Sequence, residues 1–372
     1  MGVSVIIGGD VYPAGKHMAL FEQGDAEAIF GQVLPNFLEA DCVVVNLECP
    51  LFDGNSPIVK NGPILKASTK CINALKSGQV KIVNLSNNHI LDQGEAGLRS
   101  TMDTCTRAGI ITFGAGPNLQ AARQIRVMSI QDIKIGFIGL SEHEFSLATE
   151  ESWGANPLDL IDYIRNIKAN SSEYDYLVVL LHGGSEHYPF PSPRLMETCR
   201  FLVEEGANAV VCQHSHCAGC YEEYLGSLIV YGQGNLLFDE LNQDHTFYEG
   251  FLVKLEIEKD GSSSFSLIPF EQCKNTFGVV MFSEEKKKEF ISTINLRSKA
   301  ILSKNFVRER WSDFCSKQRH RYFSTILGHG RLLKRLNRNG ILTRILYSKT
   351  ALAAVRNFVT CESHREVLEK IL

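Results

Sequence analysis

The hydrophobic positions of the first 280 residues or so follow two alternating patterns. Short apolar runs rich in valine and isoleucine are typical of buried strands, and stretches with apolar residues at every third or fourth position are typical of helices. The strand-like runs cover 3–9, 42–47, 80–86, 125–130, 133–140, 176–181, 209–212 and 228–231, and the helix-like stretches cover 25–38, 69–77, 95–108, 157–170 and 193–205. Strands that alternate with helices predict an α/β fold in which helices cover a sheet.

Two turn signals indicate that the sheets also contain antiparallel pairs. Gln131 and Asp132 separate two strand-like runs closely enough for a tight hairpin. The segment Lys259-Asp260-Gly261 separates a run at 251–258 from another at 264–270. We therefore expect mixed sheets and a body that closes near residue 280.

The last ninety residues show only the helical period, and their charge differs from that of the body. From Ser283 onward the chain has 20 Lys and Arg but 8 Asp and Glu, whereas the whole chain has a formal net charge of −4. We therefore expect two domains, 1–282 and a basic all-helical extension at 283–372. The extension could pack on the acidic body or face an anionic membrane surface or polymer. Nucleic acid is not an expected partner, because aromatic residues are not interleaved with the basic ones.

The composition narrows the class of protein. The sequence has no apolar run of 18 residues and no basic segment followed by an apolar stretch and a cleavage site, so we expect neither a membrane span nor a signal peptide. Its eleven cysteines do not follow zinc-module spacing, and Cys42, Cys71 and Cys199 lie in apolar patterns typical of core residues. We expect a reduced cytoplasmic protein, with peripheral membrane attachment as the alternative.

Polar side chains follow five of the strand-like runs. The segments read GGDVYPAG, VVNLECPLF, NLSNNHILDQG, LVVLLHGGSEHYPFPSP and AVVCQHSHCAGC. In an α/β sheet the carboxyl ends of neighbouring strands meet at one crevice. We therefore expect one site that contains Asp10, Glu48, Asn88, His89, His182, His214 and His216.

The donor types of these residues indicate a transition-metal site. One histidine at a strand end is more often a structural residue than a ligand, and one acid there is more often a solvated loop end. Five such strand ends in one chain make that explanation improbable. A mixed set of carboxylates, an amide and imidazoles suits Mn, Fe or Zn, and a shared carboxylate could bridge two divalent ions. Glu186 and His187 follow His182 closely and are candidates for substrate contact or for support of the ligands; Glu142 and His143 end another strand and are weaker candidates.

At these segments the sequence resembles the CapA-like branch of the calcineurin-like metallophosphoesterases, which is linked to bacterial poly-γ-glutamate capsule synthesis. The resemblance covers residues 3 to about 240 and implies a four-layer α/β/β/α sandwich with a dinuclear metal site. It implies that Glu48 bridges the ions and that Asp10, Asn88, His182, His214 and His216 are further ligands. It also implies that His89 acts as the general acid and that Asn88 has a part in catalysis besides its role as a ligand. Asn46, Asp92, Glu186, His187 and Tyr188 are the remaining candidates for contacts to the substrate or the ligands.

Two positions depart from the wider superfamily. Tyr12 stands where a histidine ligand is common, and Gln213 stands where glycine commonly precedes the first histidine of the last motif. The resemblance implies a metal-dependent hydrolase whose substrate is a phosphoester or an anionic polymer such as polyglutamate. The alternative is a non-catalytic assembly factor for capsule synthesis or export that only holds the polymer.

Overall fold

The computed structural model describes residues 2–239, 244–272, 274, 276–328 and 330–371. By packing, the chain divides into two compact units, Met1–Val307 and Arg308–Leu372, which are described separately. The expected domain boundary at residue 282 stays a prediction. The helix that follows this residue packs within the first unit. Within the described residues, no helix is both long enough and apolar enough to span a membrane.

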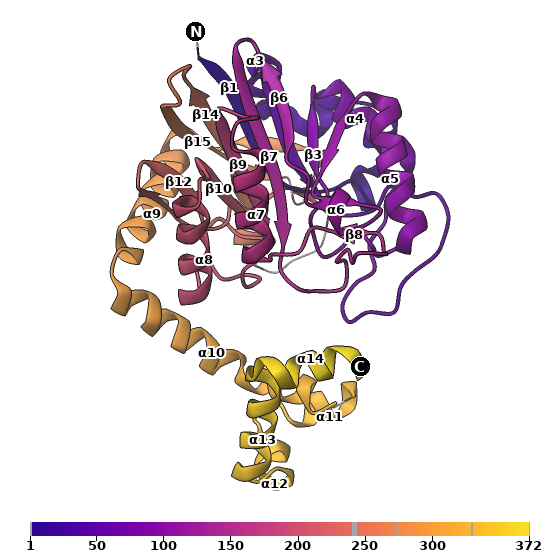
Figure 1. Ribbon diagram of the computed structural model, residues 1–372, viewed down its shortest axis with the longest axis vertical. Helices are drawn as coiled ribbons and strands as arrows, with labels where there is room; N and C mark the ends of the chain where they lie inside the picture. Colours follow the sequence, from indigo (N-terminus) through magenta and orange to yellow (C-terminus); the bar gives the residue numbers. More distant parts are fainter. Residues whose placement is uncertain (1, 240–243, 273, 275, 329, 372) are drawn as a thin grey trace. The chain divides into compact units, whose positions relative to one another are not determined.

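The first sheet of the Met1–Val307 unit has eight strands in the order β16-β15-β14-β1-β2-β3-β4, with β13 also paired to β1. Strands β15, β14, β1 and β3 of this sheet are labelled in Figure 1. The pairs of β1 with β2 and β13, and of β3 with β2 and β4, are parallel, whereas β14, β15 and β16 pair antiparallel. The strands are β1 (Val3–Tyr12), β2 (Cys42–Leu47), β3 (Ile82–Asn84), β4 (Ile111–Phe113), β13 (Asn235–Phe238), β14 (Glu249–Ile257), β15 (Ser263–Gln272) and β16 (Val279–Met281).

The second sheet has six strands in the order β11-β12-β10-β9-β7-β6. Its four central strands are parallel neighbours, and the two outer pairs are antiparallel. The strands are β6 (Arg126–Ile130), β7 (Ile133–Ser141), β9 (Tyr176–His182), β10 (Ala209–Gln213), β11 (Tyr221–Tyr224) and β12 (Ser227–Val230), and a separate pair joins β5 (Ala115–Gly116) to β8 (Gly154–Ala155). Both expected hairpins are present, as β6–β7 and β14–β15, and both sheets are mixed.

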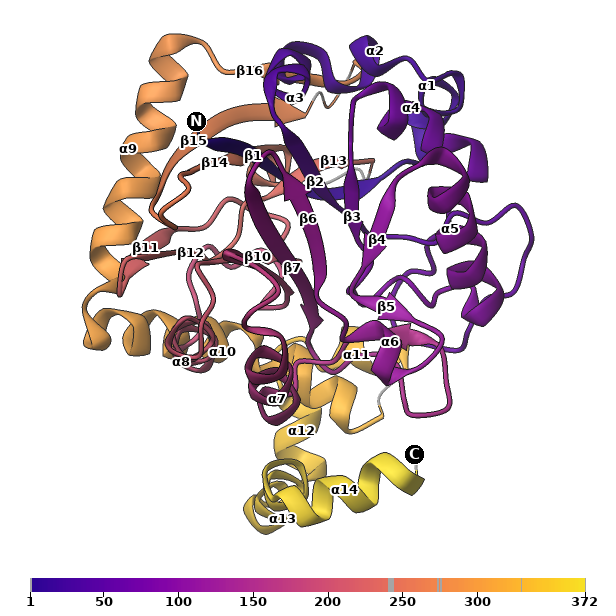
Figure 2. The ribbon, with the colours of Figure 1, turned by 45° about the horizontal axis from the view of Figure 1, so that its top comes forward.

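Three buried clusters show that the layers are α/β/β/α. Alternate residues of β1 point to opposite faces: Val5 and Ile7 join Phe137 and Val178 of the second sheet in a core between the sheets, whereas Ile6 joins a core beneath the helices of the first sheet. A third cluster packs the outer face of the second sheet against α7 (Leu160–Asn170) and α8 (Pro193–Glu204). Figure 2 shows the two sheets between their covering helices. The four-layer fold implied by the resemblance is therefore confirmed.

Side-chain caps mark the start of several helices. Ser192 accepts a hydrogen bond from the amide of Leu195 at the start of α8, and Asp159 caps α7 in the same way. The expected helix at 25–38 is wrong as one element, because Gly31 adopts a positive φ of 46° and divides it. The helices on the first sheet are α1 (Met18–Gln23), α2 (Ala26–Phe30), α3 (Leu34–Glu39), α4 (Ile72–Ser77) and α5 (Gly94–Ala108), with α6 (Leu119–Ala122) beside β5.

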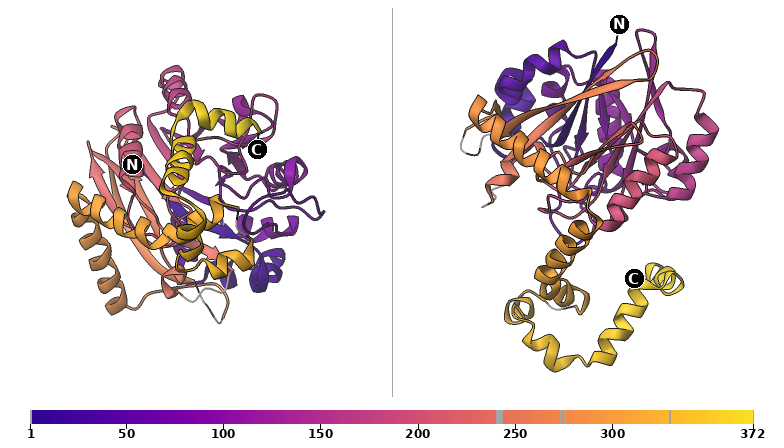
Figure 3. Two further views of the ribbon diagram at one scale, coloured as in Figure 1. Left: turned by 90° about the horizontal axis from the view of Figure 1, so that it is seen from below. Right: turned by 90° about the vertical axis from the view of Figure 1, so that its left-hand side faces the viewer.

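Helix α9 (Glu284–Ile301) closes one edge of the core between the sheets. It contacts β11 of the second sheet and β15 of the first (Figures 2 and 3). Phe290 and Ile294 on this helix are buried in the core between the sheets. Cys42, Cys71 and Cys199 are also buried, as their apolar patterns predicted.

Beyond Val307 the chain is helical as far as it is described. Helix α10 (Lys304–Ile326) runs into the Arg308–Leu372 unit, and the helices that follow are α11 (Arg331–Leu336), α12 (Ile341–Leu346), α13 (Lys349–Thr360) and α14 (Glu362–Ile371). The expected helical extension is confirmed in its secondary structure.

Candidate metal centre

The carboxyl ends of parallel strands from both sheets carry the residues that the sequence singled out. Glu48 follows β2 directly, Asn88 and His89 follow β3, His182 ends β9, and His214 and His216 follow β10. Asp10 differs from expectation, since it lies within β1 rather than after it. The pairing of β1 with β2 shifts register between Ile7 and Asp10, at Gly8 and Gly9, and a side chain on Gly9 would collide with the carbonyl oxygen of Gly234. The glycines thus make the bulge that allows β1 to continue past Asp10.

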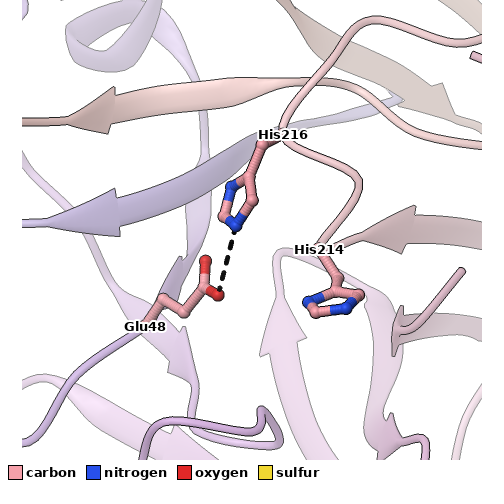
Figure 4. Close-up of side chains that lie close together, drawn as sticks. All are labelled: Glu48, His214 and His216. Atoms are coloured by element: carbon pink, nitrogen blue, oxygen red, sulfur yellow. Dashed lines mark ion pairs between the residues drawn. The ribbon is translucent and has the colours of Figure 1, made fainter. Parts of the chain in front are cut away.

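All seven side chains are buried and close to one another. None is more than 9% exposed. Two clusters of three donors form, in each of which the donor atoms lie within 4.8 Å of one another: one contains Glu48, His214 and His216 (Figure 4), and the other contains Asp10, Glu48 and His182. Because Glu48 belongs to both clusters, its carboxylate lies where a bridging ligand would have to be.

Glu48 is the chemical anomaly of the site. Its side chain is 0% exposed, yet neither carboxylate oxygen accepts a hydrogen bond from any described residue. The ring nitrogens of His182 and His216 lie 3.3 and 3.9 Å from Oε1. Burial, and then the negative charge of Asp10, raise the pKa of Glu48 to about 8. A buried carboxylate without hydrogen bonds is costly, and a bound cation would remove that cost.

Two of the histidines around Glu48 are in the neutral form, which can bind a cation. Burial lowers the pKa of His182, and burial together with the neighbouring imidazoles holds the pKa of His214 well below its usual range. Both rings are therefore neutral near pH 7, which is the state that binds metals. The Nδ1 atom of His214 has no hydrogen-bond partner among the described residues. His214 and His216 have positive φ angles of 87° and 50°, a strained backbone state found mainly at functional sites.

His216 is oriented by an amide that the sequence analysis missed. Its Nδ1 atom lies 2.8 Å from Oδ1 of Asn235, so the ring donates there and turns Nε2 toward Glu48. Burial alone would lower the pKa of His216, but Glu48, Asp10 and this hydrogen bond raise it overall. Asn235 is the last residue of the segment Tyr231-Gly-Gln-Gly-Asn235, to which the sequence analysis assigned no site residue.

Asn46 holds Asp10 in place. Its Nδ2 atom donates to Oδ1 of Asp10 at 2.8 Å, and its Oδ1 atom accepts from the amides of Asn84 and Asn87 at 3.1 and 3.2 Å. The other oxygen of Asp10 accepts from the backbone amide of His214. Asn84 and Asn87 of the third polar segment thus hold Asn46, and Asn46 in turn holds the carboxylate of Asp10.

Asn88 is oriented by Glu144, a second residue that the sequence analysis missed. Nδ2 of Asn88 donates to Oε2 of Glu144 at 2.9 Å, and Oδ1 of Asn88 lies 3.1 Å from Nε2 of His182. The amide oxygen therefore points into the centre. The strand-end signal after β7 drew attention to Glu142 and His143, but His143 is exposed, and the contact to Asn88 comes from Glu144.

His89 belongs to a buried chain of three residues. Its Nδ1 atom lies 2.6 Å from Oδ2 of Asp92, and the other carboxylate oxygen of Asp92 accepts from the amine of Lys60 at 2.7 Å. Lys60 and Asp92 are 2% and 0% exposed in their side chains. Asp92 was a candidate from sequence, whereas Lys60 lies in an irregular segment between β2 and η3 (Thr69–Cys71) that carries no strand-end signal. With Nδ1 engaged by Asp92, Nε2 is the atom of His89 that can exchange a proton.

The remaining candidates lie at the rim of the centre. Glu186 and His187 are exposed, and the His187 ring lies 6.3 Å from that of His216. Tyr188 is buried, with its ring 5.8 Å from that of Phe190. Tyr12 packs its ring against Phe238 at 5.1 Å.

A cavity of about 590 Å³ begins at His187 and at Cys217, the residue after His216. Its opposite wall is α9, which contributes Lys286 and Arg297. Arg297 donates to the carbonyl oxygen of Ala218 at 2.7 Å and forms no ion pair within the described part of the chain. Lys286, in contrast, pairs with Glu249 and Glu271. Asp244, Glu249 and Glu289 also line the cavity, so it combines carboxylates with a guanidinium that forms no ion pair with any described residue.

A family model and several known proteins match this chain, and the residues that the family model matches include the segments that form this centre. The family model described as "Bacterial capsule synthesis protein PGA_cap" matches residues 4–240. A PGA biosynthesis protein CapA of Bacillus subtilis is 28% identical over 275 residues, which cover 73% of this chain and 72% of that protein. A capsule biosynthesis protein CapA of Bacillus anthracis is 26% identical over 68% of this chain and 64% of its own length. The solved structure of an NAD nucleotidase of Haemophilus influenzae matches 86% of this chain and 60% of its own with a TM-score of 0.44 and 10% identity.

Proposed function

This chain belongs to the bacterial capsule synthesis protein family PGA_cap, and from that premise we propose that it is a metal-dependent hydrolase with a dinuclear site. The substrate is a phosphoester or the amide of an anionic polymer such as polyglutamate. The observation that carries the proposal is the buried carboxylate of Glu48, which accepts no hydrogen bond and is shared by two clusters of metal-binding donors. The mixed donor set favours Mn, Fe or Zn.

The residues present fit two divalent ions. Asp10, Glu48, Asn88, His182, His214 and His216 would hold them, and their supporting hydrogen bonds come from Asn46, Glu144 and Asn235. When bound, such ions supply Lewis-acid activation of water and neutralisation of charge at the reacting centre. Asp10, Asn88 and His216 are already held by neighbouring side chains, which reduces the cost of organising the site.

His89 is the proposed general acid. Asp92 accepts the proton of Nδ1 and thereby fixes the ring, and Lys60 holds Asp92 from the other side. The Nε2 atom can then hold a proton for the leaving oxygen or nitrogen. The ring is buried with its partners, so the position of that proton is defined before the substrate arrives.

The cavity beside the centre is the proposed location for the part of the substrate that does not react. His187 connects it to the metal-binding histidines, and Arg297 offers a guanidinium to an anionic group. Pro189 lines the cavity, and the rings of its two neighbours in sequence, Tyr188 and Phe190, pack on each other. Asp244, Glu249 and Glu289 in the same walls would repel an anionic group, so only the part of the cavity around Arg297 suits one.

The test combines metal content with turnover. Purified protein should contain transition metal by elemental analysis and should hydrolyse aryl phosphates or γ-glutamyl anilides. Glu48→Ala should lose metal and activity together, whereas His89→Asn should keep metal and lose activity. His143→Asn, at an exposed histidine of a neighbouring loop, serves as the matched control and should keep both. Full metal content in Glu48→Ala would contradict the proposed bridge.

A non-catalytic role is the second candidate, and Tyr12 is the observation that favours it. Its ring packs on Phe238 where the wider superfamily has a histidine ligand, so one ion would have fewer protein ligands. In that case the centre would hold a polymer during assembly or export rather than cleave it. Metal-loaded protein without turnover on phosphoester and amide panels, together with a functional His89→Ala variant in cells, would decide for this role.

A further inference from the structure

The Arg308–Leu372 unit reverses the usual distribution of polar and apolar side chains. Its buried side chains are polar: Ser324, Asn337 and Thr343 are 2%, 0% and 5% exposed. Among the residues of this unit whose side chains are described, no hydrophobic one is buried. Helices in water are held mainly by packing of an apolar face, so the apolar side chains of this unit require a cover that comes from outside it.

Hydrogen bonds among Ser324, Asn337 and Thr343 orient α11 and α12, the two helices whose apolar side chains are most exposed. Nδ2 of Asn337 donates to Oγ of Ser324 at 2.8 Å and to Oγ1 of Thr343 at 2.7 Å, and its Oδ1 atom accepts from the amide of Thr343. These bonds connect α10 to the turn between α11 and α12. No residue of α11 is buried, and on α12 only Thr343 is.

Apart from Thr343, every residue of α11 and α12 is either apolar or basic. Helix α11 reads RLLKRL and α12 reads ILTRIL. Leu332, Leu336 and Ile345 are 72%, 60% and 73% exposed. Between Asp313 and Glu362 the sequence contains ten Lys and Arg and no acidic residue. In the part of the chain that the structure describes, the basic residues of α11 and α12 form no ion pair with a carboxylate.

These two features narrow the choice among partners outside the chain. The same surface of a second copy would cover the apolar side chains but would bring like charges together. A nucleic acid would neutralise the arginines and leave the leucines in water. An anionic lipid surface satisfies both groups, because leucine and isoleucine enter the acyl boundary while arginine and lysine stay among the headgroups.

We propose that α11 and α12 form a docking surface for anionic lipid. The surface consists of Leu332, Leu336 and Ile345 for the acyl boundary, and of Arg331, Lys334, Arg335 and Arg344 for the headgroups. This attachment is independent of the metal centre, so its failure would leave the proposed hydrolase untouched.

The test is flotation of the full-length protein with lipid vesicles. The protein should float with vesicles of phosphatidylcholine and phosphatidylglycerol but not with phosphatidylcholine alone, and salt should release part of it. The triple variant Arg331→Gln/Lys334→Gln/Arg335→Gln should bind on the order of 100-fold more weakly. The triple variant Leu332→Ser/Leu336→Ser/Ile345→Ser should also lose binding. The matched control is Ile161→Ser/Leu225→Ser/Leu296→Ser, at positions 63–74% exposed in the other unit, and it should bind like the wild type.

Several results would overturn the proposal. One is that the wild-type protein fails to bind anionic vesicles or binds neutral vesicles equally well. Another is that either triple variant binds as tightly as the wild type. A dimer in solution that the leucine variant disrupts, without vesicle binding by the wild type, would assign the surface to a second copy. Capture by single-stranded RNA instead of vesicles would overturn it as well. If circular dichroism shows that the leucine triple loses helix, the single Leu332→Ser variant, at a side chain without packing to lose, takes its place.

Discussion

The substitution Glu48→Gln tests how much folding stability the buried carboxylate costs the protein when no metal is bound. In the metal-free wild type, burial and Asp10 raise the pKa of Glu48 from 4.5 to about 8. The folded state then keeps a proton that the unfolded state has already released at any pH between these values. Stability is therefore greatest below the unfolded pKa and is lost as the pH rises through the folded pKa.

The size of the effect follows from the shift. Each pH unit of the interval costs about 1.4 kcal/mol, so the full interval costs about 5 kcal/mol. The side chain of Glu48→Gln does not titrate and escapes this loss. We expect the variant to be the more stable metal-free protein near pH 8, although it binds metal poorly.

The assay is urea unfolding of chelator-treated full-length protein between pH 5 and 8.5. Both proteins carry Trp311→Phe, so that Trp153 alone reports on the Met1–Val307 unit. Glu95→Gln, which removes an exposed carboxylate, controls for the general effect of one charge. Saturating metal should restore the stability of the wild type at high pH and leave Glu48→Gln unchanged. Parallel curves for the wild type and Glu48→Gln across this pH range would refute the reasoning.

Three further predictions concern residues that support the centre. Lys60→Met removes the cation that holds Asp92 and should lower kcat by about 10- to 100-fold at unchanged metal content; an unchanged kcat would mean that Lys60 is only structural. Asn235→Leu removes the acceptor that orients His216 and should weaken metal affinity by about 10- to 100-fold in a chelator competition, a result that unaltered affinity would contradict. Arg297→Gln, in the cavity beside the centre, should raise KM for anionic substrates with little change in kcat, and the neighbouring cation substitution Lys286→Gln, at a residue already paired with carboxylates, should have the smaller effect.

The sequence contained the main features of the fold and of the centre because both depend on short-range patterns. Valine-rich runs mark the parallel strands, and an acid, amide or histidine directly after such a run marks the edge where the strands end. Asp10, Glu48, Asn88, His182 and His214 each have this signal in their own segment. The rule that these strand ends meet then brings together residues more than 200 positions apart.

The supporting residues could not be found in this way because their roles depend on long-range contacts. Lys60 lies in an irregular segment, and only the folded chain brings its amine to Asp92. Asn235 begins β13, a short strand that pairs in parallel with β1, and its distance to His216 depends on that pairing. The packing of the helix after residue 282 depends on long-range contacts as well. Helix α9 looks from sequence like the start of the extension, yet Phe290 and Ile294 complete the core between the sheets.

The apolar residues of the C-terminal helices show a different limit of sequence patterns. Their helical period correctly predicted helices with basic outer faces, and by the usual logic the apolar positions should face a core. The structure instead buries Asn337 with Ser324 and Thr343 and leaves Leu332 and Leu336 exposed. An amphipathic pattern therefore indicates that one face avoids water, but it does not identify the surface that covers this face. For α11 and α12 that surface has to be both apolar and anionic, because the same turns of helix carry leucine beside arginine.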